Sequence, residues 1–531
     1  MKRASRLVGA LCVAALLLAA CGGSDNSGSA GAKRFASGGT LTWAVGSDPG
    51  NLNPLMTVLQ VTRQFDDLLY DHLVYLKRDG SIASGLATKW QTTLTSATFT
   101  LAKGITCADG SPMKASDVAG TFSFIGNPAN KSPLLGVFVP PGIKATADDT
   151  AGTVTLTAAQ PDPFLIHNAS EVSVVCGKGL KDPNGLKAGK HGSGPFTLTA
   201  SVAGDRYTFA KRAGYSWGPG GVGTGEQGVP DKVVMRVIAN ETTATNLLLS
   251  GQLNLATVVG PDRKRVESQK LSKSEDRAPL GEVWFNQAAG HPGQDERVRQ
   301  ALTSALDLPE MGRVMTEGTG LPAEGLVTAS PDPCTGDSVK GNQPAHDTAR
   351  AGTLLDQAGW AKGGDGIRVK DGRRLKLTVI YGSEFGESVA SGMELLAQQW
   401  RQLGVDASLK GVTATQLNDV LFASGAWDAG LIQLTVGVPT QIVPFLSGDA
   451  PPKGTNFSHI DNTEYARLAG EATRLTGAQS CAQWNAAEAA LFKRADVVRF
   501  VDSTVPTFAK GAELDAGYPG VPPLTVRMTA Q

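Results

Sequence analysis

The chain has 531 residues, 41% of them hydrophobic, and its 49 basic side chains balance its 49 acidic ones. Zero net charge and the lack of a strongly basic run exclude the electrostatic footprint of a nucleic-acid-binding protein. No apolar run after residue 20 reaches the roughly 18 residues of a membrane span, which excludes a transmembrane channel or transporter core. The roughly 490 residues that follow the N-terminal segment are enough for a large core or several domains.

The N-terminal segment resembles a bacterial lipoprotein signal. Its start is positively charged, Leu7 to Ala20 is apolar but too short to span a bilayer, and Cys21 follows two alanines. The resemblance implies cleavage before Cys21, whose thiol would carry a lipid that anchors the protein to the outer face of the bacterial cell membrane. An ordinary secretory signal with an incidental Cys21 is the alternative. Residues 21–38, rich in Gly, Ser and Ala, are expected to form a flexible linker.

Beyond the linker, strand-like runs alternate with amphipathic helices without a fixed repeat, which indicates an α/β or α+β fold. The clearest helix is Asp295–Leu308, whose apolar residues share one stripe, and Pro309 should end or kink it. Shorter helices are expected at Ser116–Phe124 and Glu241–Ser250. The expected strands are Thr40–Val45, Ala97–Leu101, Thr153–Thr157, Tyr207–Ala210, Lys232–Ile238 and Leu375–Ile380.

Four cysteines remain once Cys12 in the signal and the lipidated Cys21 are set aside. An even number in an exported chain favours disulfides. Of the three possible connectivities we favour Cys107 with Cys176 and Cys334 with Cys481, because each pair closes a long loop within one half of the chain. Four buried free thiols are the alternative, and zinc is disfavoured because no C-x-x-C or paired-His spacing accompanies them.

Several enzyme-like patterns lack the context that their chemistry needs. Ser216 lies in a G-x-S-x-G pattern, but the Gly218–Gly221 run that follows cannot open the helix of a nucleophile elbow. Two G-x-G-x-x-G matches, at residues 218–223 and 223–228, do not lead into a helix either. No two of the six histidines have the spacing that places metal ligands on one helix face. We therefore expect no catalytic residue, no metal and no cofactor.

Seven motifs occur in the order found in one family. Together they resemble the large extracytoplasmic solute-binding proteins of ABC importers, the group that contains oligopeptide, dipeptide and nickel binders. The block at Asp109–Val118 is the most specific of them. The others are Gly85–Ala87 with Trp90, Gly192–Phe196, Ser250–Leu253, Arg297–Asp307, Leu354–Trp360 and Leu403–Val405.

The resemblance implies an α/β, two-lobed, periplasmic-binding-protein-like fold that closes around a ligand at a hinge. By analogy, lobe one holds residues 39–280 and 495–531, with an extra subdomain near 76–190. Lobe two holds residues 281–494. The crossings that form the hinge are expected near Gly281–Asn286 and near Ala495, so both favoured disulfides would fall within one lobe.

Loops at strand ends that face the cleft are the expected binding surface. The large aromatic Phe285, like the neighbouring Trp284, is as well explained by core packing, and Tyr381 by a structural hydroxyl contact. Peptide binders of the family place an aspartate for the peptide's amine where this chain has Gly437, which puts a free-amine peptide in doubt. The ligand-binding candidates are Ser47, Asn53, Phe285, Asn286, Tyr381, Gln433, Thr435 and Gly437.

These observations predict a lipid-anchored, monomeric solute-binding component of an ABC importer. Its partners would be a peptide or related solute, the permease subunits and the membrane that holds its anchor. Two alternatives stay open: a lipoprotein hydrolase that uses Ser216, and a ligand sensor that keeps the fold without transport.

Overall fold

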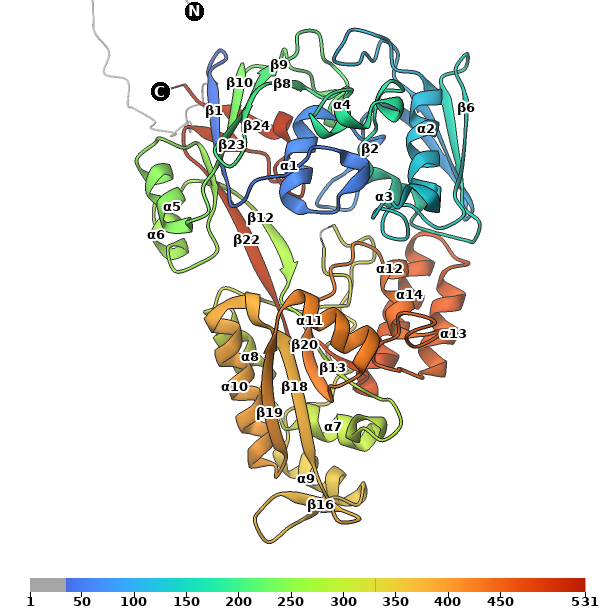
Figure 1. Cartoon of the computed structure of the whole chain (residues 1–531), viewed down its shortest axis with the longest axis vertical. Coiled ribbons are helices and arrows are strands. Elements are labelled where there is room, and N and C mark those ends of the chain that lie inside the picture. The colour runs from blue at the N-terminus through green and yellow to red at the C-terminus, as the bar shows by residue number, and fades with distance from the viewer. Residues whose placement is uncertain (1–34, 330, 531) are drawn as a thin grey trace, which may run out of the picture. The chain divides into compact units, whose positions relative to one another are not determined.

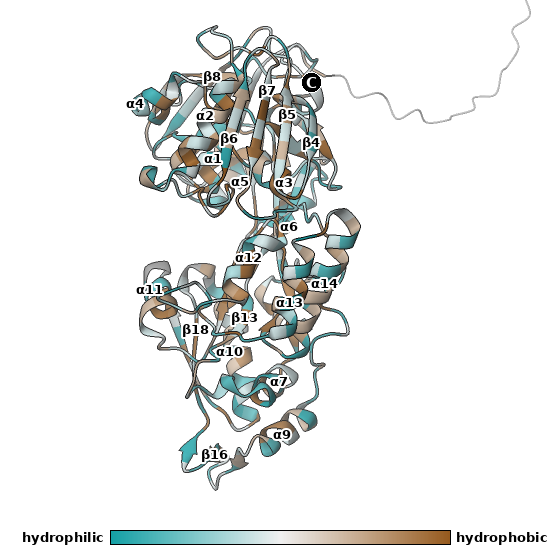
Figure 2. Ribbon diagram, turned by 90° about the vertical axis from the view of Figure 1, so that its right-hand side faces the viewer, coloured by the Kyte–Doolittle hydropathy of each residue, from teal (hydrophilic) through white to brown (hydrophobic). Residues whose placement is uncertain are grey.

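The computed structural model describes residues 35–329 and 331–530, and the chain from Phe35 onward forms one compact unit. Cys21, the signal and most of the predicted linker lie outside the described residues. The unit has two lobes joined by strands β12 and β22, and Figure 2 shows the same lobes after a 90° turn. Among the described residues, no helix has both the length and the apolar character needed to cross a bilayer.

Lobe one is built on a mixed eight-stranded sheet. Strand β1 (Thr40–Val45) lies inside it, parallel to β10 and β11, and buries Leu41, Trp43 and Val45, as its alternating pattern predicts. The order is β12-β22-β11-β1-β10-β9-β8, and β14 pairs with β22. The other strands are β8 (Phe196–Val202), β9 (Arg206–Lys211), β10 (Lys232–Val237), β11 (Leu255–Thr257), β12 (Ser272–Pro279), β14 (Leu321–Pro322) and β22 (Val501–Ala509).

A second, four-stranded antiparallel sheet adds a subdomain to lobe one, and helix α2 packs on its strands β6 and β7. Its strands are β4 (Ala87–Thr92), β5 (Ser96–Leu101), β6 (Lys144–Asp148) and β7 (Thr153–Thr157). Two further strand pairs are β2 (Val74–Leu76) with β3 (Ile82–Ser84), and β23 (Ala512–Leu514) with β24 (Val526–Met528). The helices of lobe one are α1 (Gln60–Leu69), α2 (Ala115–Gly126), α3 (Leu165–Ser170), α4 (Pro183–Lys187), α5 (Glu241–Leu249) and α6 (Arg263–Glu267).

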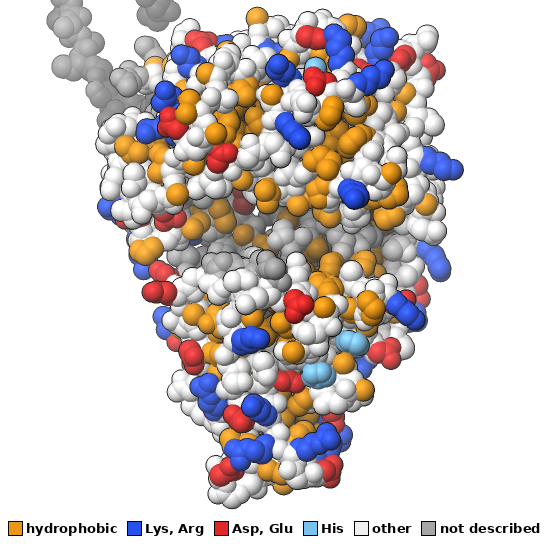
Figure 3. All heavy atoms as spheres, in the orientation of Figure 1, with side chains coloured by type: hydrophobic (Ala, Val, Ile, Leu, Met, Phe, Trp, Pro, Cys, Tyr) orange, Lys and Arg blue, Asp and Glu red, His pale blue; other side chains and the backbone are white. Residues whose placement is uncertain are grey.

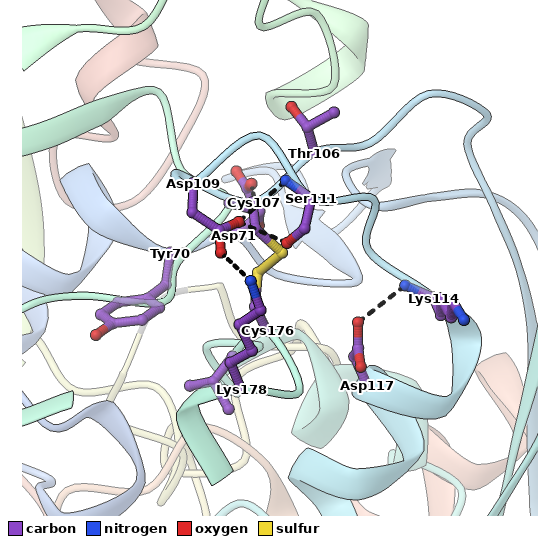
Figure 4. The surroundings of a disulfide bond; sticks show 12 residues. Tyr70, Asp71, Thr106, Cys107, Asp109, Ser111, Lys114, Asp117, Cys176 and Lys178 are labelled. Atoms are coloured by element: carbon purple, nitrogen blue, oxygen red, sulfur yellow. Dashed lines mark hydrogen bonds and ion pairs between the residues drawn. A yellow bond between two sulfur atoms is a disulfide. The ribbon is translucent and has the colours of Figure 1, made fainter. Parts of the chain in front are cut away.

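Both favoured disulfides are present in the structure: Cys107 pairs with Cys176 and Cys334 with Cys481. Figure 4 shows that the specific motif of the sequence surrounds the first of them. Asp109 accepts hydrogen bonds from the Ser111 backbone (3.0 Å) and pairs with the Lys178 ammonium (2.6 Å). The motif therefore holds a turn beside the disulfide and is structural.

Lobe two is built on a five-stranded sheet in the order β19-β18-β20-β13-β21. Strands β18, β19 and β20 run parallel, and β13 is antiparallel to β20 and β21. These strands are β13 (Glu282–Phe285), β18 (Lys376–Gly382), β19 (Asp406–Val412), β20 (Ala429–Ile432) and β21 (Val497–Val498). A small separate sheet holds β15 (Ala361–Lys362), β16 (Arg368–Lys370) and β17 (Arg373–Arg374).

The helices of lobe two include the clearest predicted one, which is shorter than expected. Helix α7 covers Glu296–Ser304, with Asp295 as its N-cap, and Pro309 stands in the first turn of the next helix, α8 (Leu308–Met315). Proline therefore begins a new helix here, because its missing N–H is not needed in a first turn. The others are α9 (Thr348–Gln357), α10 (Gly386–Gln402), α11 (Ala414–Asp419), α12 (Pro439–Leu446), α13 (Thr463–Ala472) and α14 (Gly477–Lys493).

The predicted hinge corresponds to β12 and β22, which connect the lobes and pair antiparallel from Ser272–Ala509 to Pro279–Asp502. The first crossing follows β12 at Gly281, whose φ of 130° favours glycine. The second crossing follows Val498, because β21 still pairs with β13 inside the five-stranded sheet. The chain thus leaves the sheet of lobe two after Val498 rather than near Ala495.

Candidate functional site

The parallel strands of lobe two end together at the edge that faces lobe one in Figure 1. Strands β18, β19 and β20 end at Gly382, Val412 and Ile432, and each leads into a loop or short helix at that edge. Ligands of open α/β sheets bind at the carboxyl ends of the strands. This edge and the surface of lobe one opposite it therefore form the candidate ligand site.

The loop at residues 433–438, which follows β20, carries three of the predicted ligand-binding residues and is held from several sides. Its Val436 N–H donates to Thr328 Oγ1 (3.1 Å), and the Thr328 N–H donates back to Val436 O (3.0 Å). The Gly437 N–H donates to Gln441 Oε1 (2.8 Å), and the side chain of Gln433 donates to Pro279 O of the hinge strand β12. The loop is thus fixed to both the hinge and helix α12.

Buried charges surround the two crossing segments. Arg499 is fully buried and donates to Glu282 Oε1 (2.9 Å), to Asp502 and to Gly325 O (3.0 Å). Arg277 donates to the other oxygen of Asp502 (3.2 Å). Burial raises the pKa of Glu282 to about 7, against the opposing effect of the Arg499 guanidinium. The hinge charges therefore satisfy one another inside the protein.

Lobe one exposes several large apolar side chains. Met56, the last residue of a short 3-10 helix, η1 (Pro54–Met56), is one of them, and Val58 and Leu59, which lead into α1, are two more. Val137, in a neighbouring loop, is also exposed. Figure 3 shows hydrophobic side chains on both sides of the hollow between the lobes. This apolar surface fits a solute that brings hydrophobic groups into the cleft.

The predicted residues of lobe one lie at the end of β1. Ser47 is exposed directly after this strand. Asn53 is buried, and its Oδ1 accepts the Leu55 N–H (3.1 Å) as the N-cap of η1. The Asn53 side chain is therefore occupied by a local structural contact, while Ser47 is free to meet a ligand.

The predicted residues of lobe two divide into a buried set and a set in the loop at the carboxyl edge of the sheet. Phe285 is buried in the core beside Trp400, with ring centroids 6.3 Å apart, and the amide of Asn286 donates to Trp427 O (3.0 Å). Tyr381 is half-buried within β18 rather than after it. Gln433, Thr435 and Gly437 all stand in the loop at the carboxyl edge, and Gln433 and Thr435 are exposed.

Two residues that the sequence analysis missed bring the lobes into contact. Gln441 of α12 donates from its amide nitrogen to Val137 O (2.8 Å) and Asn168 Oδ1 (3.3 Å) of lobe one. Phe164 of lobe one lies 6.5 Å from the ring of Trp484 in lobe two. The sequence held one weak local signal for Gln441. It stands two residues after Pro439, the first residue of α12, where a Gln side chain can cap the helix by accepting the N–H of the preceding N-cap residue, here Val438.

The structure gives the enzyme-like patterns structural explanations. Ser216 is exposed, and its neighbours Tyr215 and Trp217 are buried donors to the carboxylate of Asp71, at 2.5 and 2.9 Å. A short 3-10 turn at Pro219–Gly221 follows, in place of the helix of a nucleophile elbow. Within the described residues, no group of three His, Cys, Asp or Glu side chains is arranged to hold a metal ion.

The chain matches the model of a protein family described as bacterial extracellular solute-binding proteins, family 5 Middle, over residues 81–448, more than half of its length. Protein XP55 of Streptomyces lividans is 28% identical over 383 residues, which are 70% of this chain and 66%, just under two thirds, of XP55. The periplasmic murein peptide-binding protein MppA of Escherichia coli (strain K12) is 26% identical over 495 residues, 85% of each chain.

A solved structure shares the fold. It is that of a substrate-binding protein from Microbacterium hydrocarbonoxydans in complex with 4-hydroxybenzoate hydrazide, with a TM-score of 0.71 and 24% sequence identity. The alignment covers 92% of this chain and 100% of that one.

Proposed function

Because the chain belongs to family 5 of the bacterial extracellular solute-binding proteins, we propose that it is the lipid-anchored solute-binding component of an ABC importer. It captures a peptide or related solute by closure of its two lobes and delivers that solute to the permease. Cys21 carries the anchor on the outer face of the cell membrane, and the protein works as a monomer without a cofactor.

The observation that carries this proposal is the facing pair of surfaces between two hinged lobes. The loop at residues 433–438 lies at the carboxyl edge of the lobe-two sheet, and the apolar segment Met56–Leu59 belongs to lobe one. A solute between them contacts both lobes at once, so its binding free energy favours the closed form. The moving parts are then residues 39–280 with 499–531, and 281–498, because β21 pairs within the lobe-two sheet.

The ligand class follows from Gly437. This residue offers no side chain, and its N–H is already bound to Gln441 Oε1. A buried ammonium without a carboxylate partner costs several kcal/mol. The site therefore suits a peptide whose amine is modified or lies outside the cleft, or another solute with hydrophobic groups, better than a peptide with a buried free amine. Ser47 and Thr435 supply its exposed polar contacts, together with the side-chain oxygen of Gln433, whose nitrogen is bound to Pro279 O.

Native mass spectrometry of the full-length protein, extracted from membranes in mild detergent, tests the proposal. The mass of the protein should correspond to a chain that begins at Cys21 and carries a lipid, plus a bound solute that survives purification. A chain without lipid would contradict the anchor. A protein that binds no member of a peptide and solute library would contradict solute capture.

One substitution and one deletion distinguish the importer component from a hydrolase and from a sensor. Ser216→Ala should leave the bound solute and its amount unchanged, whereas a hydrolase would accumulate uncleaved substrate in this variant. Deletion of the protein should abolish uptake of the identified solute. Uptake that persists, together with an altered transcriptional response to the solute, would instead identify a sensor.

A further inference from the structure

Helix α3 and the residue before it belong to different cores. Leu165, Ile166 and Ala169 of α3 are buried in the apolar core of lobe one. Phe164, only 4% exposed, is instead buried in a cluster whose other buried members all lie between Trp284 and Val497 of lobe two. A lobe-one side chain thus fills part of the lobe-two core, at an edge where α3 faces α12 and α14 in Figure 1.

Lobe one holds this phenylalanine with a buried carboxylate. Asp162 Oδ1 accepts the Phe164 N–H (2.9 Å), and Asp162 Oδ2 accepts the Asn168 side-chain amide (2.9 Å). The oxygen of that same Asn168 amide accepts from Gln441 of lobe two (3.3 Å). One carboxylate therefore orients both groups that lobe one presents to lobe two at this point.

Lobe two answers through Gln441, whose side chain has two tasks. Its oxygen accepts the N–H groups of Gly437 (2.8 Å) and Val438 (3.3 Å) in the loop at the candidate ligand site. Its nitrogen donates to Val137 O (2.8 Å) of lobe one. When the lobes separate, the nitrogen loses its acceptors in lobe one, whereas the oxygen keeps its donors in the loop of lobe two. The amide of Gln441 therefore contacts lobe one only in the closed form and holds the loop in both forms.

We propose that Phe164 and Gln441 form a latch that stabilises the closed lobes, and that Gln441 is a positioning residue that couples closure to the loop at residues 433–438. The latch lies away from the β12–β22 hinge, so a small rotation at the hinge separates its partners. Opening exposes the Phe164 ring and leaves its pocket beside Trp484 unfilled, which opposes release of the solute. This inference rests on the lobe closure of the proposed function.

The test measures the distance between spin labels on the ligand-free, full-length protein. Lys144→Cys in lobe one and Glu464→Cys in lobe two place the labels at exposed positions outside the latch. Phe164→Ala should raise the ratio of open to closed molecules roughly tenfold or more. Phe422→Ala is the matched control, because Phe422 packs on the same cluster but belongs to lobe two. It should leave the ratio of open to closed molecules within about twofold of the wild-type value, a smaller change than the loss of one hydrogen bond would cause.

Gln441 is tested by two substitutions that separate its tasks. Gln441→Glu keeps an acceptor for the Gly437 and Val438 N–H groups but cannot donate to Val137 O or to Asn168 Oδ1. It should raise the ratio of open to closed molecules roughly fivefold or more, the value of the two hydrogen bonds lost. Gln441→Leu should open the lobes as well and also release the loop, seen as faster amide hydrogen exchange at residues 433–438 that Gln441→Glu does not show.

Three results would overturn the latch: distances in Phe164→Ala and Gln441→Glu that match the wild type, equal opening in the Phe422→Ala control, or opening by Gln441→Leu alone. The outcome is separate from that of the proposed function. Solute that still co-purifies with a protein whose variants do not open would remove the latch and leave the function. Variants that open in a protein that binds no solute would do the reverse.

Discussion

The hinge and the latch both join lobe one to lobe two, but their chemistry is opposite. At the hinge, Arg499 and Arg277 neutralise the buried Glu282 and Asp502. At the latch, a phenyl ring and an amide make the contact, and burial lowers the pKa of the neighbouring His167 to about 4, so its ring is neutral at neutral pH. Surfaces that come apart when the lobes open therefore use uncharged groups, which tolerate both water and burial. Buried ions must keep their partners, so they lie at the hinge.

Of the changes considered, loss of Arg499 should lower the free energy of unfolding most. Arg499→Met leaves Glu282 and Asp502 buried without this guanidinium, which should lower the free energy of unfolding by about 3–5 kcal/mol. Denaturant unfolding measures the loss. Arg467→Met, which removes an exposed Arg paired with Glu464 and Glu471, should cost far less, because water already solvates this ion pair. Equal costs at the two positions would mean that the hinge charges are solvated and that the contrast with the latch is wrong.

A buried carboxylate of lobe two, that of Glu488, should make the stability depend on pH. Glu488, four residues after Trp484 on α14, accepts from Ser338, and burial raises its pKa to about 7. The folded protein then holds a proton that the unfolded chain releases near pH 4.5, so this group's stabilisation is full below pH 4.5 and is lost as pH rises through 7. The free energy of unfolding should fall by up to about 3 kcal/mol over that interval.

Glu488→Gln should flatten this decline, and the part that remains includes the contributions of Glu282 and Asp332, since burial raises the pKa of Glu282 to about 7 and that of Asp332 to about 6. Ser338→Ala is the control, because it removes the hydrogen-bond donor but keeps the ionisable group, so the decline should persist. A Glu488→Gln variant with an undiminished slope would show that the decline has another origin.

The parts of the fold that sequence could predict depend on local patterns. Thr40–Val45 forms the expected strand because its alternating side chains need only one apolar face. The favoured cysteine pairs were found because disulfides confined to half a chain leave few arrangements. The end of α7 at Ser304 was missed, because the buried apolar residues Ala305 and Leu306 continue the stripe although the helix has already ended.

The candidate site was harder to predict, because its key contacts join residues far apart in the sequence. Phe164 and Gln441 meet groups of the opposite lobe, and nothing within ten residues of either predicts that partner. Asn53 was predicted because it lies in a loop at a strand end, and Asn286 because its amide near the crossing can both donate and accept, yet both amides bind their own backbone surroundings. Residue type alone does not distinguish a side chain that waits for a ligand from one that caps a helix.

The smallest expected effect concerns two glutamines that hold the loop at residues 433–438, one near the hinge and one at the latch. Gln433 donates to Pro279 O beside the hinge, and Gln441 donates to Val137 O at the latch. A contact close to the rotation axis moves little when the lobes part, so the Gln433 bond should persist in both forms. Gln433→Leu should therefore lower the free energy of unfolding by about 0.5–1.5 kcal/mol and leave the open-to-closed ratio unchanged.

The spin-label distances that test the latch also test this prediction, with Gln441→Leu as the comparison. Both variants lose one side-chain amide that tethers the loop at residues 433–438, so a general loosening of the loop would open the lobes equally in the two. If only Gln441→Leu opens the lobes, then the contact far from the hinge resists opening and the contact close to the hinge does not. Opening by Gln433→Leu to the same extent would mean that the loop itself, rather than its contact with lobe one, holds the lobes together.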